Sequence, residues 1–189
     1  MLAELDNCRV ISEPAVPNIF YQLSIMYRNG YLNKEELKIL ILGLFIKDKK
    51  TIQRTFIKFT SWMIDLLPII IEIFPNTPWL YVYRNPAEIL VSALNRRSEL
   101  ITLNKRKPEV LIRQIKRAKS EIRELSKEEF LAKLTAYNFQ LVIENYSKSN
   151  GLIIEYPFIK KQFEKILNHF KIKASIKEWK GIKEKSQYY

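Results

Sequence analysis

Residues 79–92 read Trp79-Leu-Tyr-Val-Tyr-Arg-Asn-Pro-Ala-Glu-Ile-Leu-Val-Ser92, the pattern of a strand followed by a sharply capped helix. The run 80–83 is short, apolar and rich in aromatic residues, as expected of a strand buried on both faces. Asn85 can cap the helix, Pro86 fits its first position, and Glu88 can return a hydrogen bond to the cap. The stretch therefore predicts a strand–helix unit of an α/β fold.

Two side chains in this stretch are candidates for binding an anion. Arg84 falls at the carboxyl end of the predicted strand, beside a helix N-terminus, where open α/β sheets bind ligands and anions are favoured. Ser92 falls on the same helix face as Asn85 and Ile89, so its hydroxyl can meet a ligand that Arg84 holds. An ordinary strand–helix junction with a surface arginine is the alternative, and the spacing alone leaves both interpretations open.

Strands and helices alternate along the rest of the chain. Further strands are predicted at 9–12, 55–59 and 151–156. The predicted helices cover 16–28, 34–46, 61–74, 86–103, 109–125, a long helix from 126, and 157–170. This alternation predicts a three-layer α/β fold, with a parallel sheet covered by helices on both faces, in a single domain over 1–189.

Several local signals place the helix boundaries and faces. The segments 33–36 and 126–129 are capping signatures, Gly30 is a helix stop, and Pro68 is expected to kink or divide its helix. The apolar run 37–46 predicts a helix that is buried on most sides. In the long helix, the residues expected to pack inward are Phe130, Leu134, Tyr137, Leu141 and Ile143, or their neighbours.

The composition limits the class of protein. A chain of 189 residues with 47% hydrophobic content is long enough for one well-buried domain, and its four glycines argue against linkers and repeats. Cys8 is the single cysteine, so an internal disulfide is impossible and a reducing compartment, the cytoplasm, is the simpler interpretation. The sequence has no His/Cys cluster, so we expect no metal. The charge of +12 fits an anionic ligand but points to it only weakly.

The sequence offers no signal for a membrane or for secretion. Residues 1–20 have no basic start and no long apolar segment, so no signal peptide is expected. The apolar run 37–46 is far too short to span a bilayer. We therefore expect no transmembrane segment.

The arginine, Asn-Pro and the serine eight residues after the arginine resemble the 3′-phosphate-binding motif of the sulfotransferase superfamily, which has a P-loop-type α/β fold. Further landmarks follow in that family's order, and the resemblance spans roughly residues 2–172. They are Ser12-Glu-Pro14, Lys58-Phe-Thr-Ser-Trp62, Phe74-Pro-Asn-Thr-Pro-Trp79 and Gly151-Leu-Ile-Ile-Glu-Tyr156. The resemblance implies transfer of a sulfuryl group from 3′-phosphoadenosine-5′-phosphosulfate (PAPS) to a hydroxyl or amine.

The resemblance also implies roles for individual residues. Arg84 and Ser92 would hold the 3′-phosphate, and Lys58 would contact the 5′-phosphosulfate and neutralise the leaving group. Glu13 resembles the glutamate of heparan-type members, which takes the proton of the acceptor. Cytosolic members use a histidine at the position of Thr60, so that mechanism is not available here. A lysine that reaches to solvent and a glutamate that caps a turn or pairs with a lysine are the alternatives for Lys58 and Glu13.

One part of the family pattern is missing. Sulfotransferases begin with a central strand and a Gly/Ser/Thr/Lys-rich loop around the 5′-phosphosulfate, and no glycine of this chain lies in such a loop. We therefore expect an N-terminally truncated fold, with two unpaired strand edges and a slot in the core. Either the true start lies upstream or the gene is decayed. In both cases the chain as written should be weak or inactive.

Two further functions stay open. A non-catalytic nucleotide-binding or interaction module would keep the 3′-phosphate site without the chemistry. A basic nucleic-acid-binding helical protein is disfavoured, because Glu109, Glu121 and Glu124 interrupt the basic face at 105–123. The acceptor is not identified, and a sugar, a lipid headgroup, a small alcohol and a protein side chain all remain open, as does the oligomeric state.

Overall fold

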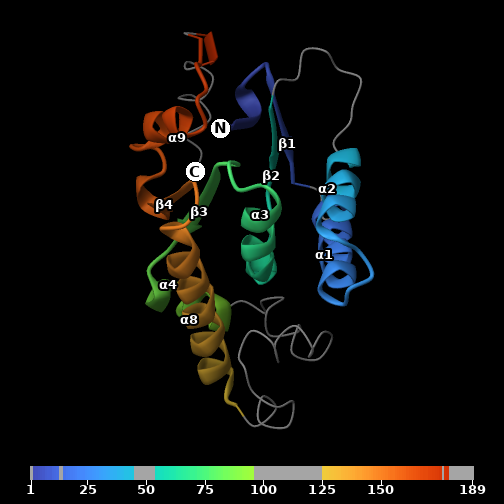
Figure 1. Cartoon of the computed structure of the whole chain (residues 1–189). Coiled ribbons are helices and arrows are strands. Elements are labelled where there is room, and N and C mark those ends of the chain that lie inside the picture. Colours follow the sequence, from blue (N-terminus) through green and yellow to red (C-terminus); the bar gives the residue numbers. More distant parts are fainter. Residues whose placement is uncertain (1, 13–14, 45–53, 96–124, 176, 179–189) are drawn as a thin grey trace. The chain divides into compact units, whose positions relative to one another are not determined.

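The structure is a computed structural model of the whole chain, and it describes residues 2–12, 15–44, 54–95, 125–175 and 177–178. These residues form a mixed α/β protein (Figure 1). They divide into two compact units. We call Met1–Thr77 together with Lys160–Tyr189 the split unit, and Pro78–Ile159 the continuous unit. Each unit is described by itself.

The split unit contains a parallel pair of strands, β1 and β2, in which Cys8 lies opposite Arg54 and Ile11 opposite Ile57. The helix α1 contacts both α2 and η2, and α2 also contacts α3. The elements of this unit are η1 (Leu2–Glu4), β1 (Cys8–Ile11), α1 (Ala15–Arg28), α2 (Lys34–Gly43), β2 (Arg54–Ile57), η2 (Ser61–Leu66), α3 (Leu67–Ile73) and α9 (Phe163–His169).

The continuous unit contains the second parallel pair, β3 and β4, in which Trp79 lies opposite Gly151 and Tyr83 opposite Glu155. Its helices α4 and α8 pack together through a small core of Ala93, Phe130, Leu131 and Leu134. The elements of this unit are β3 (Trp79–Tyr83), α4 (Pro86–Asn95), α8 (Lys127–Tyr146), β4 (Gly151–Glu155) and η3 (Tyr156–Phe158).

The predicted parallel strands are all present, but the described strands form two separate pairs. In β2, the Arg54 N–H donates to the Asn7 carbonyl directly before β1, and the Lys58 N–H donates to the Ile11 carbonyl of β1. Because backbone groups alternate in direction along a strand, the N–H and C=O groups of Thr55 and Ile57 point to the side opposite β1. In β3, the Trp79 N–H donates to the Asn150 carbonyl directly before β4, so by the same alternation the backbone N–H and C=O groups of Leu80 and Val82 point to the side opposite β4. Within the described ranges, no third strand pairs with either edge.

Most predicted helix starts are confirmed. Asn33 and Glu36 form a complete capping box at the start of α2, and Ser126 and Glu129 form another at α8. Asn85 caps α4 through its side-chain oxygen, which accepts a hydrogen bond from the N–H of Ala87 at 2.9 Å. The return bond expected from Glu88 is not among the hydrogen bonds of the described residues.

Two helices end in the same left-handed turn. After α1, Gly30 has φ of 77°, the Gly30 N–H donates to Tyr27, and the Tyr31 N–H donates to Met26. These two bonds define a Schellman motif, so the predicted helix stop at Gly30 is confirmed. The end of α9 has the same bonds, with Lys171 at φ of 52° in the place of the glycine.

The prediction that α2 is buried on most sides is wrong. Only Leu37 and Ile41 of α2 are buried, whereas Ile39 is 67% exposed, because neighbours in the described residues cover one face of the helix only. In α8, where the prediction allows Ile143 or a neighbour to pack inward, the neighbour Val142 is buried and Ile143 is 65% exposed. Ile143 follows Leu134 by nine residues, or two and a half turns, and therefore lies on the opposite face.

The helix predicted over 61–74 is divided, as expected from Pro68. A 3₁₀ segment, η2, runs to Leu66, and Pro68 lies in the first turn of α3, where its missing N–H costs no helical hydrogen bond. Glu13, the predicted helix 109–125 up to its last residue, and the basic face 105–123 lie outside the described residues.

Candidate functional site

The site begins with Arg84, which directly follows β3 in the continuous unit. Its side chain is exposed, and its Cζ atom lies 3.9 Å from the centroid of the Tyr156 ring. Tyr156 directly follows β4, and the register that places Tyr83 opposite Glu155 brings the two next residues to the same end of the pair. The parallel register therefore brings Arg84 and Tyr156 together.

Aromatic packing fixes the strand that carries Arg84. The rings of Tyr81 and Tyr83 both make edge contacts with Phe139 of α8, at centroid distances of 6.2 and 5.9 Å. The Tyr81 side chain is half-buried, and this burial raises the pKa of its hydroxyl. The end of β3 is thus held against α8, and this packing fixes the backbone from which the Arg84 side chain extends.

The helix α4 begins directly after Arg84. Its first N–H groups have no partner in the helix itself, and Asn85 satisfies the one on Ala87. Ser92 lies two turns further along α4 and is exposed. The sequence-predicted pair, Arg84 and Ser92, therefore lies on one strand–helix unit, although no hydrogen bond joins the two side chains within the described residues.

The two predicted catalytic residues are not part of this unit. Lys58 directly follows β2 in the split unit, where its N–H donates to the Ile11 carbonyl at 2.9 Å and its side chain is exposed. It is at a strand's carboxyl end, as the sequence predicts. Glu13 lies outside the described residues, and its role stays a prediction.

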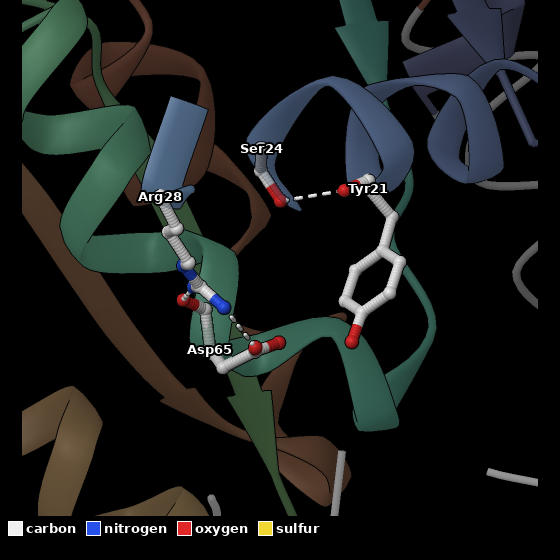
Figure 2. A network of polar contacts seen from close by, with 4 residues as sticks. All are labelled: Tyr21, Ser24, Arg28 and Asp65. Atoms are coloured by element: carbon white, nitrogen blue, oxygen red, sulfur yellow. Dashed lines mark hydrogen bonds and ion pairs between the residues drawn. The ribbon is translucent and has the colours of Figure 1, made fainter. Parts of the chain in front are cut away.

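The sequence did not predict the polar cluster that Arg28 and Asp65 form in the split unit (Figure 2). The Arg28 guanidinium at the end of α1 donates to the Asp65 carboxylate at 2.9 Å and to the Asp65 carbonyl at 2.6 Å. Asp65 is only 7% exposed. In the sequence, Asp65 is the one charged residue of the apolar run 62–71, a signal for a buried partner. This cluster joins α1 to η2 and gives no indication of binding a ligand.

Cys8 is not a reactive group. Burial raises the pKa of its thiol, and Glu178 also raises it, while Arg54 has the opposite effect. A buried thiol with a raised pKa stays protonated at neutral pH and is a poor nucleophile. Within the described residues, no group of three or more His, Cys, Asp or Glu side chains is arranged to hold a metal ion.

Comparisons of the chain with protein-family models, with curated proteins and with solved structures find no match. The helices in the described ranges are all too short or too polar to cross a membrane.

Proposed function

We propose that the chain is a sulfotransferase-like protein whose continuous unit holds the 3′-phosphate of PAPS. One observation carries the proposal. Arg84 is exposed at the carboxyl end of β3, directly ahead of the capped helix that carries Ser92, and its guanidinium has no hydrogen bond or ion pair within the described residues. Its N–H donors are therefore available to an external anion.

This arrangement suits a phosphate dianion. A guanidinium offers two parallel N–H donors to two phosphate oxygens, and such charge-assisted pairs are roughly twice as strong as neutral hydrogen bonds. The partial positive charge at the start of α4 adds to the attraction. The Ser92 hydroxyl, on the same helix, supplies a further donor for a ligand that reaches along α4.

The proposed reaction is sulfuryl transfer to a hydroxyl or amine. The acceptor atom forms a bond to sulfur, the bond from sulfur to the 5′-phosphate oxygen breaks, and Glu13 takes the acceptor's proton. Lys58 balances the charge that develops on the leaving 3′-phosphoadenosine-5′-phosphate. Because the sequence has no Gly-rich loop for the 5′-phosphosulfate, transfer by this chain should be impaired. We place the chain in the cytoplasm, because its single cysteine, Cys8, cannot form an internal disulfide.

The test is a calorimetric titration of the full chain with 3′-phosphoadenosine-5′-phosphate. We expect wild-type binding, and loss of at least tenfold in affinity in Arg84→Ala, because a charged hydrogen-bonding group is removed from a phosphate. Lys148→Ala is the matched control, since it removes one exposed cation of the same unit outside the site. Its affinity should change less than twofold.

Each other outcome has a clear meaning. A folded wild-type chain that does not bind the nucleotide would refute the 3′-phosphate site. Equal effects of Arg84→Ala and Lys148→Ala, with steep salt dependence, would point to a general polyanion such as nucleic acid. Binding without sulfuryl transfer, even after a Gly-rich loop is added to the N-terminus, would favour the non-catalytic nucleotide-binding module.

A further inference from the structure

The contact between Arg84 and Tyr156 has a geometry that matters for anion binding. The Cζ atom of Arg84 lies 3.9 Å from the ring centroid, well inside the range of about 6 Å in which a cation is attracted to an aromatic face. Tyr156 is 40% exposed, so the ring covers one side of the guanidinium at the surface of the unit. A guanidinium that stacks on a ring keeps the N–H donors at its rim free for hydrogen bonds.

The positions of both residues follow from the fold of one unit. Each directly follows one strand of the β3–β4 pair, and the register places them at the same end. No carboxylate forms an ion pair with Arg84 within the described residues, so the contact with the ring is the interaction that restrains its long side chain. Without the contact with the ring, the Arg84 side chain would be mobile in the free protein and would be ordered by the anion. The rotamer entropy lost at that step would weaken anion binding.

We propose that Tyr156 is a positioning residue that holds the Arg84 guanidinium ready for two oxygens of a phosphate group. The proposal deepens the proposed function, because it concerns the same anion half-site. It differs from that function in one respect: it applies to any phosphate that Arg84 binds, and so it can be tested without the nucleotide.

The test is NMR spectroscopy of the full chain, with inorganic phosphate as the probe. In the absence of phosphate, the ring current of Tyr156 should shift the signals of the Arg84 side chain upfield. Tyr156→Leu should abolish this shift and weaken phosphate binding about two- to fivefold, the usual range for an exposed cation–π contact. Tyr156→Phe keeps the ring face and should retain both the shift and the affinity.

Tyr146→Leu is the matched control. Tyr146 is an equally exposed tyrosine of the same unit, but its ring contacts Trp79 instead of Arg84. This variant should leave the Arg84 signals and the phosphate affinity unchanged. Thermal unfolding of each variant separates a loss of positioning from a loss of folding.

Several results would overturn the proposal. One is an Arg84 signal without a ring-current shift. Others are equal phosphate affinities in wild type and Tyr156→Leu, or a loss in Tyr156→Phe as large as in Tyr156→Leu. Failure of the nucleotide to bind, with phosphate binding still dependent on Tyr156, would refute the proposed function and leave the positioning role in place.

Discussion

At the scale of single residues, Gly30 and Lys171 take the same position in two helix-ending turns, but only Lys171 has a Cβ atom. Both are the left-handed residue of a Schellman motif, at φ of 77° and 52°. For a residue with a Cβ atom, this conformation costs roughly 1–2 kcal/mol. The turn at Lys171 also presents its carbonyl to Arg54, which donates at 3.1 Å. Lys171 is therefore a strained position that helps to join α9 to β2.

The strain predicts opposite effects of two substitutions. Lys171→Gly should stabilise the protein by about 1 kcal/mol, and Gly30→Ala should destabilise it by about 1 kcal/mol, because only glycine adopts the left-handed region without strain. Urea unfolding followed by circular dichroism measures both. Lys173→Gly, at a nearby exposed position with no positive φ, is the control. A stabilisation of the same size in the control would contradict this account of Lys171.

The Arg28–Asp65 pair makes a second residue-scale prediction. Arg28→Met should destabilise the protein by about 3 kcal/mol, because it leaves the buried Asp65 carboxylate without its counter-charge. The double variant Arg28→Met with Asp65→Leu should recover part of that loss. Urea unfolding of the two single variants and the double variant gives the coupling. Simple additivity of the two single effects would show that the pair does not act as a unit.

At the scale of elements, Gly151 determines how β4 packs beside β3. A Cβ atom at Gly151 would overlap the six-membered ring of Trp79. The indole is also held by a hydrogen bond of 3.0 Å that its Nε1–H donates to the Ser149 hydroxyl, which in turn donates to the Asn145 carbonyl at the end of α8. The indole therefore has little freedom to move away, and β3, β4 and α8 meet at this glycine.

Gly151→Ala should destabilise the continuous unit by about 2 kcal/mol through this overlap. Tryptophan fluorescence during urea unfolding is the measurement. Gly43→Ala is the control, because a Cβ atom at Gly43 meets nothing within 4 Å and alanine favours the end of α2. We expect Gly43→Ala to be neutral or slightly stabilising. A Gly151→Ala variant as stable as wild type would show that the indole can shift.

At the scale of the whole molecule, the two ends of the described chain meet in the split unit. One carboxylate oxygen of Glu178 accepts from the Asp6 N–H at 2.9 Å, and the other accepts from the Ser175 N–H at 2.6 Å. Hydrogen bonds from the Ser175 hydroxyl and backbone, and then from the Asp6 backbone, lower the pKa of Glu178 below its ordinary value of 4.5. The carboxylate form of Glu178 therefore favours the folded state.

A depressed pKa fixes the sign of the pH dependence. The stabilisation by Glu178 is fully present above its unfolded pKa, and it is lost as the pH falls through the lower folded value. Glu178→Gln should therefore lower the urea midpoint at pH 7, and the difference from wild type should shrink as the pH falls below 4.5. Because Glu178 is only partly buried, solvent screens the interaction and the effect should be small. A difference that grows towards acid pH would contradict the assignment.

The features that were predictable from the sequence depend on local interactions, and those that were not depend on long-range ones. Caps and helix stops at Asn33, Ser126 and Gly30 were predictable, because each depends on hydrogen bonds to residues a few positions away. The strands and their parallel direction were predictable from hydrophobic runs and alternation. The exposure of Ile39, and the burial of Val142 in place of Ile143, were not predictable, because a run of apolar residues does not say which neighbours will cover it.

The amino-acid sequence alone specifies the positions of the elements and the placement of Arg84 between a strand and a capped helix, because these are local consequences of φ/ψ preference and hydrogen bonding. The contacts of Arg28 with Asp65 and of Arg84 with Tyr156 join residues far apart in the chain. Such contacts arise only when the strand register and helix packing bring the segments together. Tertiary packing therefore decided that Arg84 rests on an aromatic ring, and that no described residue occupies its N–H donors.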